Sequence, residues 1–149
     1  MRARQRDEPG DRPLAPGVRP DIENTLARYA WLFDANDIDG LRDCFTTDAA
    51  LEIGDERAVT GREAVIAELR RRRERYAGSG ALPWHLTSTV EIVTADELSA
   101  TVRSRFALTI LEADGPPRLA SVGSYDDELV CVEGRWRIRR RRVRQPAGR

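Results

Sequence analysis

The chain has 149 residues, and its 25 basic side chains balance 25 acidic ones, so the formal net charge is zero. This length corresponds to a single domain. All the basic residues are Arg, which excludes Schiff-base chemistry, a lysine general base and a phosphate-loop lysine. The single histidine excludes a metal site with several His ligands, so no metal is expected. Any imidazole catalysis must therefore use His85.

No apolar stretch approaches the roughly 20 residues that a membrane helix needs, and residues 1–20 lack the apolar segment of a signal peptide. We therefore expect a cytoplasmic protein that has no membrane partner. The two cysteines, Cys44 and Cys131, are isolated within apolar stretches. This placement indicates small core residues rather than a disulfide framework.

The first predicted element is a helix that follows a polar N-terminal segment. Residues 1–20 are rich in Arg, Pro and acids and have little to bury, which predicts a disordered extension, with a strand arm as the alternative. Asp21 follows Pro20 and is a suitable N-cap. Apolar residues then recur every three or four positions, which predicts a helix of about four turns. Its apolar stripe consists of Ile22, Leu26, Tyr29, Ala30 and Phe33.

Two further helices and a short strand are predicted before the middle of the chain. Residues 35–40 break the first helix, and residues 41–45 read as a short second one. Alternation over residues 49–53 predicts a half-buried strand. Thr60 and Gly61 open a third helix that ends in an arginine-rich run at residues 70–75. This run is either a solvated helix end, where Arg favours the helix dipole, or an anion-binding patch.

The second half of the chain reads as strands at residues 86–93, 101–111, 118–132 and 135–144. In the second of these, one face is almost entirely apolar and the other is polar, so one side of the sheet is expected to face a core. Helices followed by such a sheet predict an α+β fold. The face expected to point inward carries Val102, Ser104, Phe106, Leu108 and Ile110.

The last hairpin predicts its own register. A turn centred on Glu133 and Gly134 places opposed residues at positions that sum to 267. Acidic side chains then face arginines across the sheet, so the C-terminal arginines are largely paired and no nucleic-acid partner is expected. Two of the predicted pairs, Asp127 with Arg140 and Tyr125 with Arg142, fall on the apolar face. There they form either an open rim of the sheet or a polar wall in a pocket. The predicted pairs are Cys131 with Trp136, Leu129 with Ile138, Glu128 with Arg139, Asp126 with Arg141, Asp127 with Arg140 and Tyr125 with Arg142.

Several segments together resemble the SnoaL-like branch of the nuclear transport factor 2-like superfamily. They are residues 26–41, 45–49 and 61–63, the isolated His85, and residues 134–138. The resemblance implies a cone-shaped α+β barrel, with three N-terminal helices packed in a curved, mostly antiparallel sheet, over residues 21–144. Residues 145–149 are then a disordered tail. It also implies a homodimer and a reaction that needs no cofactor.

The resemblance extends to candidate catalytic residues. Asp34 matches the aspartate that pairs with a pocket histidine in scytalone dehydratase-like and bile-acid dehydratase-like members, and His85 matches that histidine. Tyr29 matches a pocket tyrosine. Ser104 stands where scytalone dehydratase-like enzymes have a second histidine, and Ile53 stands where ketosteroid isomerase-like enzymes have their general base.

The residues support the same pair without the family. Asp34 lies at the edge of the apolar stripe, where a carboxylate needs a partner, and His85 can hold that charge and exchange a proton near neutral pH. As alternatives, His85 is structural, Asp34 caps the following helix and Tyr29 is ordinary core. Besides these three, the residues expected to contact substrate are Phe33, Ile53, Trp84, Ser104, Phe106 and Tyr125.

The predicted function is dehydration, isomerisation or cyclisation of an apolar, carbonyl-bearing small molecule of polyketide-like or steroid-like character. In this hypothesis His85 is the general acid and base, Asp34 orients it, and Tyr29 donates a hydrogen bond to the substrate oxygen. The alternative hypothesis is a non-catalytic binding or assembly module that resembles the small subunit of a ring-hydroxylating dioxygenase.

Overall fold

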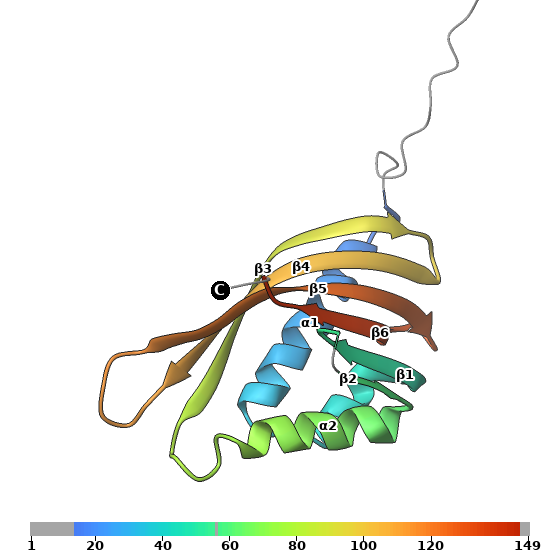
Figure 1. The fold of residues 1–149 in the computed structure, drawn as a ribbon. Helices are drawn as coiled ribbons and strands as arrows, with labels where there is room; N and C mark the ends of the chain where they lie inside the picture. The colour runs from blue at the N-terminus through green and yellow to red at the C-terminus, as the bar shows by residue number, and fades with distance from the viewer. Residues whose placement is uncertain (1–13, 56, 147–149) are drawn as a thin grey trace, which may run out of the picture.

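The computed structural model describes residues 14–55 and 57–146. Two α-helices, α1 (Val18–Asp34) and α2 (Arg62–Glu74), cover one side of a curved six-stranded sheet (Figure 1). The strands are β1 (Phe45–Ile53), β2 (Arg57–Thr60), β3 (Leu82–Ala95), β4 (Ser99–Leu111), β5 (Arg118–Val132) and β6 (Arg135–Arg144). Their order in the sheet is β2-β1-β6-β5-β4-β3, and only the β1–β6 pair is parallel. None of the described helices is long and apolar enough to span a bilayer.

The helix α1 has the predicted apolar stripe but begins earlier than predicted. Ile22, Leu26, Tyr29 and Phe33 are all buried. The helix starts at Val18 with Gly17 as its N-cap, and the N–H of Asp21 already bonds the Gly17 carbonyl at 3.0 Å. A proline in the first turn gives up no intrahelical hydrogen bond, so Pro20 does not delay the helix. The predicted N-cap at Asp21 is therefore wrong.

The predicted extension at residues 1–20 and tail at residues 145–149 lie partly outside the described residues. Residues 1–13 and 147–149 are not described, residues 18–20 belong to α1, and residues 145–146 have no regular secondary structure.

The predicted second helix is instead a 3-10 helix, η1 (Gly40–Cys44), so the fold has two α-helices rather than three within the described residues. The Asp37 carboxylate accepts a hydrogen bond from the N–H of Gly40 at 2.9 Å, which fixes a tight turn at its start. Phe45 already begins β1, so the segment is too short for an α-helix. Cys44 is buried, and burial raises the pKa of its thiol to about 11.

The four predicted long strands are present, and β5 and β6 have the predicted bounds, whereas β3 begins four residues earlier and ends two later than predicted and β4 begins two earlier. On β4, Val102, Ser104, Phe106 and Ile110 are buried, which confirms the expected inward face. The strand β2 was missed because it has four residues, most of them exposed, and therefore shows no hydrophobic alternation.

The register of the β5–β6 hairpin is correct near the turn and wrong beyond it. Cys131 pairs with Trp136 and Leu129 with Ile138, as predicted. A bulge between these pairs and the next ones inserts an extra residue into β6, and one extra residue reverses which side chains face inward. The five outer pairs are therefore Glu128 with Arg140, Asp127 with Arg141, Asp126 with Arg142, Tyr125 with Val143 and Ser124 with Arg144.

Candidate active site

Asp34 is the last residue of α1, and a tight helix end fixes its place. The N–H of Asp37 bonds the Leu32 carbonyl at 2.9 Å, and the N–H of Asn36 bonds the Phe33 carbonyl at 3.0 Å. These two bonds define a Schellman motif, in which Asn36 takes the left-handed conformation at φ 62°. The helix therefore stops at the residue that bears the candidate carboxylate.

His85 lies on β3, which is an edge strand of the sheet. Its backbone N–H donates to Oδ2 of Asp34 at 2.7 Å, and its ring Nδ1 lies 2.6 Å from Oδ1 of the same carboxylate. Asp34 therefore satisfies a backbone N–H at the edge of the sheet that no described strand pairs. The same carboxylate orients the imidazole. This arrangement excludes the alternative in which Asp34 caps the following helix.

The carboxylate also sets the protonation pattern of the imidazole. An ionised carboxylate only accepts hydrogen bonds, so in the neutral ring Nδ1 carries the hydrogen and Nε2 carries the lone pair. Within the described residues no hydrogen bond engages Nε2. The Phe33 ring meets the imidazole edge-on at 5.2 Å, and the His85 side chain is 9% exposed. The pair is thus held in a largely dry environment with one ring nitrogen available for proton transfer.

A groove of about 810 Å³ runs between α1 and β3, and both Asp34 and His85 line it. Its volume lies within the range typical of small-molecule sites. Trp31 of α1 and Trp84 of β3 approach each other edge-to-face at 6.3 Å along this groove. The other apolar lining residues are Leu26, Ala27, Ala30, Ala35, Leu82, Pro83, Leu86 and Val90.

The charges along the groove are all negative. Glu23 and Asp34 are its charged lining residues, and no arginine of the described chain lines it, although the sequence has 25 basic residues. A bound phosphate or carboxylate would find no arginine among these described lining residues. The groove therefore favours a neutral ligand over an anionic one.

A second polar cluster is buried inside the curved sheet. Arg141 and Asp127 form an ion pair with two hydrogen bonds of 2.8 Å, and their side chains are 1% and 0% exposed. The guanidinium lies 4.2 Å from the ring centre of Tyr29 and 4.0 Å from that of Tyr125. The sequence alone left open whether these polar side chains form an open rim of the sheet or a polar wall. The structure shows a buried polar wall in which Asp127 pairs with Arg141 instead of the predicted Arg140.

The pKa values in this cluster follow from its burial. Burial raises the pKa of Tyr29 and of Tyr125 above the ordinary value, although the charge of Arg141 opposes the rise, so both phenols stay protonated. Burial disfavours the charged guanidinium, but the charge of Asp127 and its hydrogen bonds outweigh this and raise the pKa of Arg141. Nη1 of Arg141 and the hydroxyl of Ser104 have no hydrogen-bond partner among the described residues.

The structure brings some of the sequence-predicted residues together and separates others. Asp34 and His85 are in contact, Phe33 packs on His85, and Trp84 lines the groove. Ile53 lies on β1, four strands away from β3 in the sheet order. The remaining residues, Tyr29, Ser104, Phe106 and Tyr125, are buried on the other side of α1 and line the interior of the sheet instead of the groove.

The sequence alone did not single out three residues whose contacts the structure shows. Trp31 was not among the residues expected to contact substrate, although its partner Trp84 was. Arg141 was assigned to the outer face, because residues 139–142 are all Arg and carry no hydrophobic signal of the bulge. Arg73 was grouped with the arginine run, although its spacing from Ile66 and Leu69 places it on the apolar stripe of α2.

A curved, mostly antiparallel sheet covered by helices on one side, with a polar pair beside the first helix, defines a class of small α+β proteins. The chain belongs to the SnoaL-like domain family, whose model matches residues 18–142. A search of curated proteins finds no significant match to this chain.

Solved structures show the same fold at moderate identity. A variant of Rv3472, a protein of unknown function from Mycobacterium tuberculosis, is 31% identical, with a TM-score of 0.72 over 86% of this chain and 71% of that one. Aln2 from a Streptomyces species is 25% identical, with a TM-score of 0.81 over 89% and 94%. A putative scytalone dehydratase from Novosphingobium aromaticivorans is 25% identical, with a TM-score of 0.73 over 86% and 83%.

Proposed function

We propose that this protein is a small, cofactor-independent enzyme that dehydrates, isomerises or cyclises a neutral, carbonyl-bearing small molecule. The observation that carries the proposal is the two-point contact between Asp34 and His85 on the wall of an apolar groove. Membership of the SnoaL-like family and the likeness to a putative scytalone dehydratase support a reaction of this kind.

In the proposed dehydration, Nε2 of His85 removes a proton from the carbon next to the substrate carbonyl. The resulting imidazolium is stabilised by the Asp34 carboxylate 2.6 Å from Nδ1. The enolate then expels a β-hydroxyl group, to which Nε2 returns the proton, so that water leaves and a double bond forms. In an isomerisation the proton returns to carbon instead.

Tyr29 is the proposed hydrogen-bond donor to the substrate oxygen. Burial raises the pKa of its phenol, so the group keeps its proton and can stabilise a developing oxyanion. Tyr29 lies one turn before Phe33, whose ring contacts His85, and the two rings stack at 6.4 Å. Because Tyr29 does not line the groove, this role requires that the substrate carbonyl pass beyond the groove, between α1 and the sheet. The other reading of Tyr29, a core residue packed on Arg141, predicts no effect of removing the hydroxyl.

The groove determines the proposed substrate class. Apolar walls, two tryptophans and the lack of lining arginines among the described residues favour a neutral ring system over a phosphate or a carboxylate. We propose Trp84 and Phe33 as direct substrate contacts.

A β-hydroxytetralone is a suitable probe, because it fits this description and its dehydration yields a fluorescent naphthol. His85→Ala and Asp34→Asn should each lower kcat by about a hundredfold or more, and Tyr29→Phe should lower it by at least about tenfold. Thr94→Ala, which alters an exposed residue of β3 outside the groove, should leave kcat unchanged. Turnover by His85→Ala within about threefold of the wild type would refute the mechanism.

The second candidate function is a non-catalytic module of the dioxygenase small-subunit kind. The presence of Ser104 in place of a second pocket histidine favours it. It predicts that the wild-type protein binds the tetralone without converting it and copurifies with a larger, iron-containing subunit.

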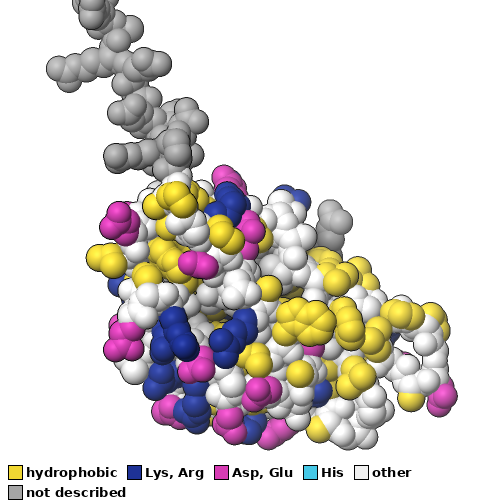
Figure 2. All heavy atoms as spheres, turned by 180° about the vertical axis from the view of Figure 1, so that it is seen from behind, with side chains coloured by type: hydrophobic (Ala, Val, Ile, Leu, Met, Phe, Trp, Pro, Cys, Tyr) yellow, Lys and Arg dark blue, Asp and Glu magenta, His cyan; other side chains and the backbone are white. Residues whose placement is uncertain are grey.

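A homodimer is the proposed assembly. Exposed apolar side chains follow the outer face of β3 and β5, and Figure 2 shows hydrophobic side chains gathered toward the hairpin between β4 and β5. A contiguous apolar surface of this kind is typical of protein interfaces. Its members include Leu119 and Val122 of β5 and, on β3, Leu82 and Leu86, which also border the groove.

A further inference from the structure

We propose that Arg73 is a positioning residue that holds Asp34, and through Asp34 the imidazole of His85, in the geometry the reaction needs. The inference rests on the proposed function, because it assigns Arg73 a role in the same site. Arg73 lies on α2, 39 residues from Asp34 along the chain, and does not line the groove.

The C-terminal turn of α1 lacks a stabilising charge of its own. The last turn contains no basic residue, although a cation is favourable at this end of a helix. Arg73 supplies the charge from the neighbouring helix. Its Nε donates to the Phe33 carbonyl at 3.2 Å, and its Nη2 donates a longer bond to the Asp34 carbonyl at 3.4 Å. The two hydrogen bonds of the Schellman motif engage the carbonyls of Leu32 and Phe33 and leave the carbonyl of Asp34 open. The bond from Nη2 of Arg73 reaches that carbonyl.

Arg73 differs from the other arginines of its run. Arg70 bonds the carboxylate of Asp39, and Arg71 and Arg72 bond that of Glu68. Arg73 is 7% exposed, and within the described residues its hydrogen bonds go only to the two backbone carbonyls of α1. Burying a guanidinium without a carboxylate is unfavourable, so the helix end must offset that cost.

The position of the Asp34 backbone decides whether its carboxylate meets His85 at two points. Oδ2 and Oδ1 lie 2.7 Å and 2.6 Å from the backbone N and Nδ1 of His85, so a small shift breaks at least one contact. Because Asp34 is the last helical residue, no following turn holds its carbonyl. A misplacement of about 1 Å can lower turnover by about a hundredfold.

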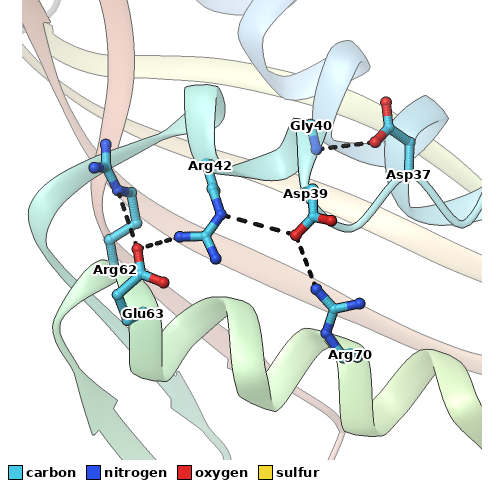
Figure 3. A network of polar contacts seen from close by, with 7 residues as sticks. All are labelled: Asp37, Asp39, Gly40, Arg42, Arg62, Glu63 and Arg70. Atoms are coloured by element: carbon cyan, nitrogen blue, oxygen red, sulfur yellow. Dashed lines mark hydrogen bonds and ion pairs between the residues drawn. The ribbon is translucent and has the colours of Figure 1, made fainter.

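The rest of the connection stays attached to α2 without Arg73. Figure 3 shows Asp39 in contact with Arg70 and Arg42, and Arg42 in contact with Glu63 of α2. These contacts tie the segment that follows α1 to α2. Replacing Arg73 should therefore loosen the last turn of α1 while the connection that follows it stays attached to α2.

The experiment uses the fact that the protein has a single histidine, so that ¹⁵N labelling of histidine reports on His85 alone. We compare Arg73→Met, Arg73→Lys and the control Arg75→Met, an exposed arginine of the same run. In the wild type and the control, the ring nitrogen shifts should show the Nδ1–H tautomer and a protected Nδ1 proton. In Arg73→Met the tautomers should mix, the proton signal should broaden, and kcat should fall at least about tenfold with little change in KM. Arg73→Lys should restore most of both.

An unchanged tautomer and unchanged kcat in folded Arg73→Met would overturn the proposal. If Arg73→Met does not give a cooperative thermal transition, Arg73→Gln, which keeps one donor without the charge, is tested against the same two results. A failure of the proposed function would look different. His85→Ala would then keep full turnover, whereas in the protein that retains His85 the imidazole tautomer would still change on Arg73→Met.

Discussion

The buried ion pair of Arg141 and Asp127 gives a quantitative test of how the interior of the sheet is stabilised. Its side chains are almost completely excluded from solvent, and the guanidinium lies over the rings of both Tyr29 and Tyr125. Arg141→Met keeps much of the side-chain volume but leaves the Asp127 carboxylate buried without a cation. Breaking such a pair from one side costs about 3–5 kcal/mol. At about 2–4 °C per kcal/mol, the midpoint of thermal unfolding should fall by about 6–20 °C.

The assay is urea unfolding followed by far-UV circular dichroism, which gives the free energy of unfolding for each variant. The matched control is Arg103→Met, because Arg103 pairs with Glu91 at a site where both side chains are more than half exposed. That variant should lose at most about 1 kcal/mol.

The double variant Arg141→Met with Asp127→Leu removes both charges. It should be more stable than Arg141→Met alone, because no uncompensated charge remains in the interior. A loss of less than about 1 kcal/mol for Arg141→Met, equal to that of the exposed control, would show that water solvates the remaining carboxylate. That result would refute the reasoning from burial.

Two further predictions concern the pH dependence of stability and the assembly. The hydrogen bond from Arg71, together with Arg72 and against the effect of burial, lowers the pKa of Glu68 below its ordinary value of 4.5. Glu68 therefore stabilises the fold above about pH 4.5, and this stabilisation is lost as the pH falls through the folded-state pKa of the carboxyl group. The midpoint of thermal unfolding of Glu68→Gln should accordingly lie below that of the wild type at pH 7, and the two midpoints should converge in acid. For the assembly, light scattering on the wild-type protein should give twice the protomer mass. Leu119→Asp should give a monomer, whereas Leu98→Asp, which changes a similarly exposed leucine in the β3–β4 turn, should leave the dimer intact. A monomeric wild type would contradict the proposed dimer.

Local patterns in the sequence were sufficient for most of the secondary structure. The stripe of α1 and the long strands follow from apolar spacing, because side-chain period and burial are coupled within one element. The contact between Asp34 and His85 was also predicted, because a carboxylate at the edge of an apolar stripe needs a partner and the chain has one histidine.

The features that the sequence left undecided depend on single insertions and on contacts between distant elements. Four consecutive arginines carry no alternation, so only the bulge in β6 decides that Arg141 and not Arg140 faces the interior. Arg73 reaches the end of α1 only because the fold brings the C-terminal part of α2 to that end.

The sequence by itself determined one domain, the alternation of its strands and the identity of the one possible histidine base. Tertiary structure decided where that base faces. The groove forms between α1 and the free edge of β3, and its position depends on how the sheet curves against the helix rather than on any local repeat. For the same reason Tyr29 and Trp31, two residues apart on one helix, lie on opposite sides, one within the sheet beside Arg141 and the other on the groove.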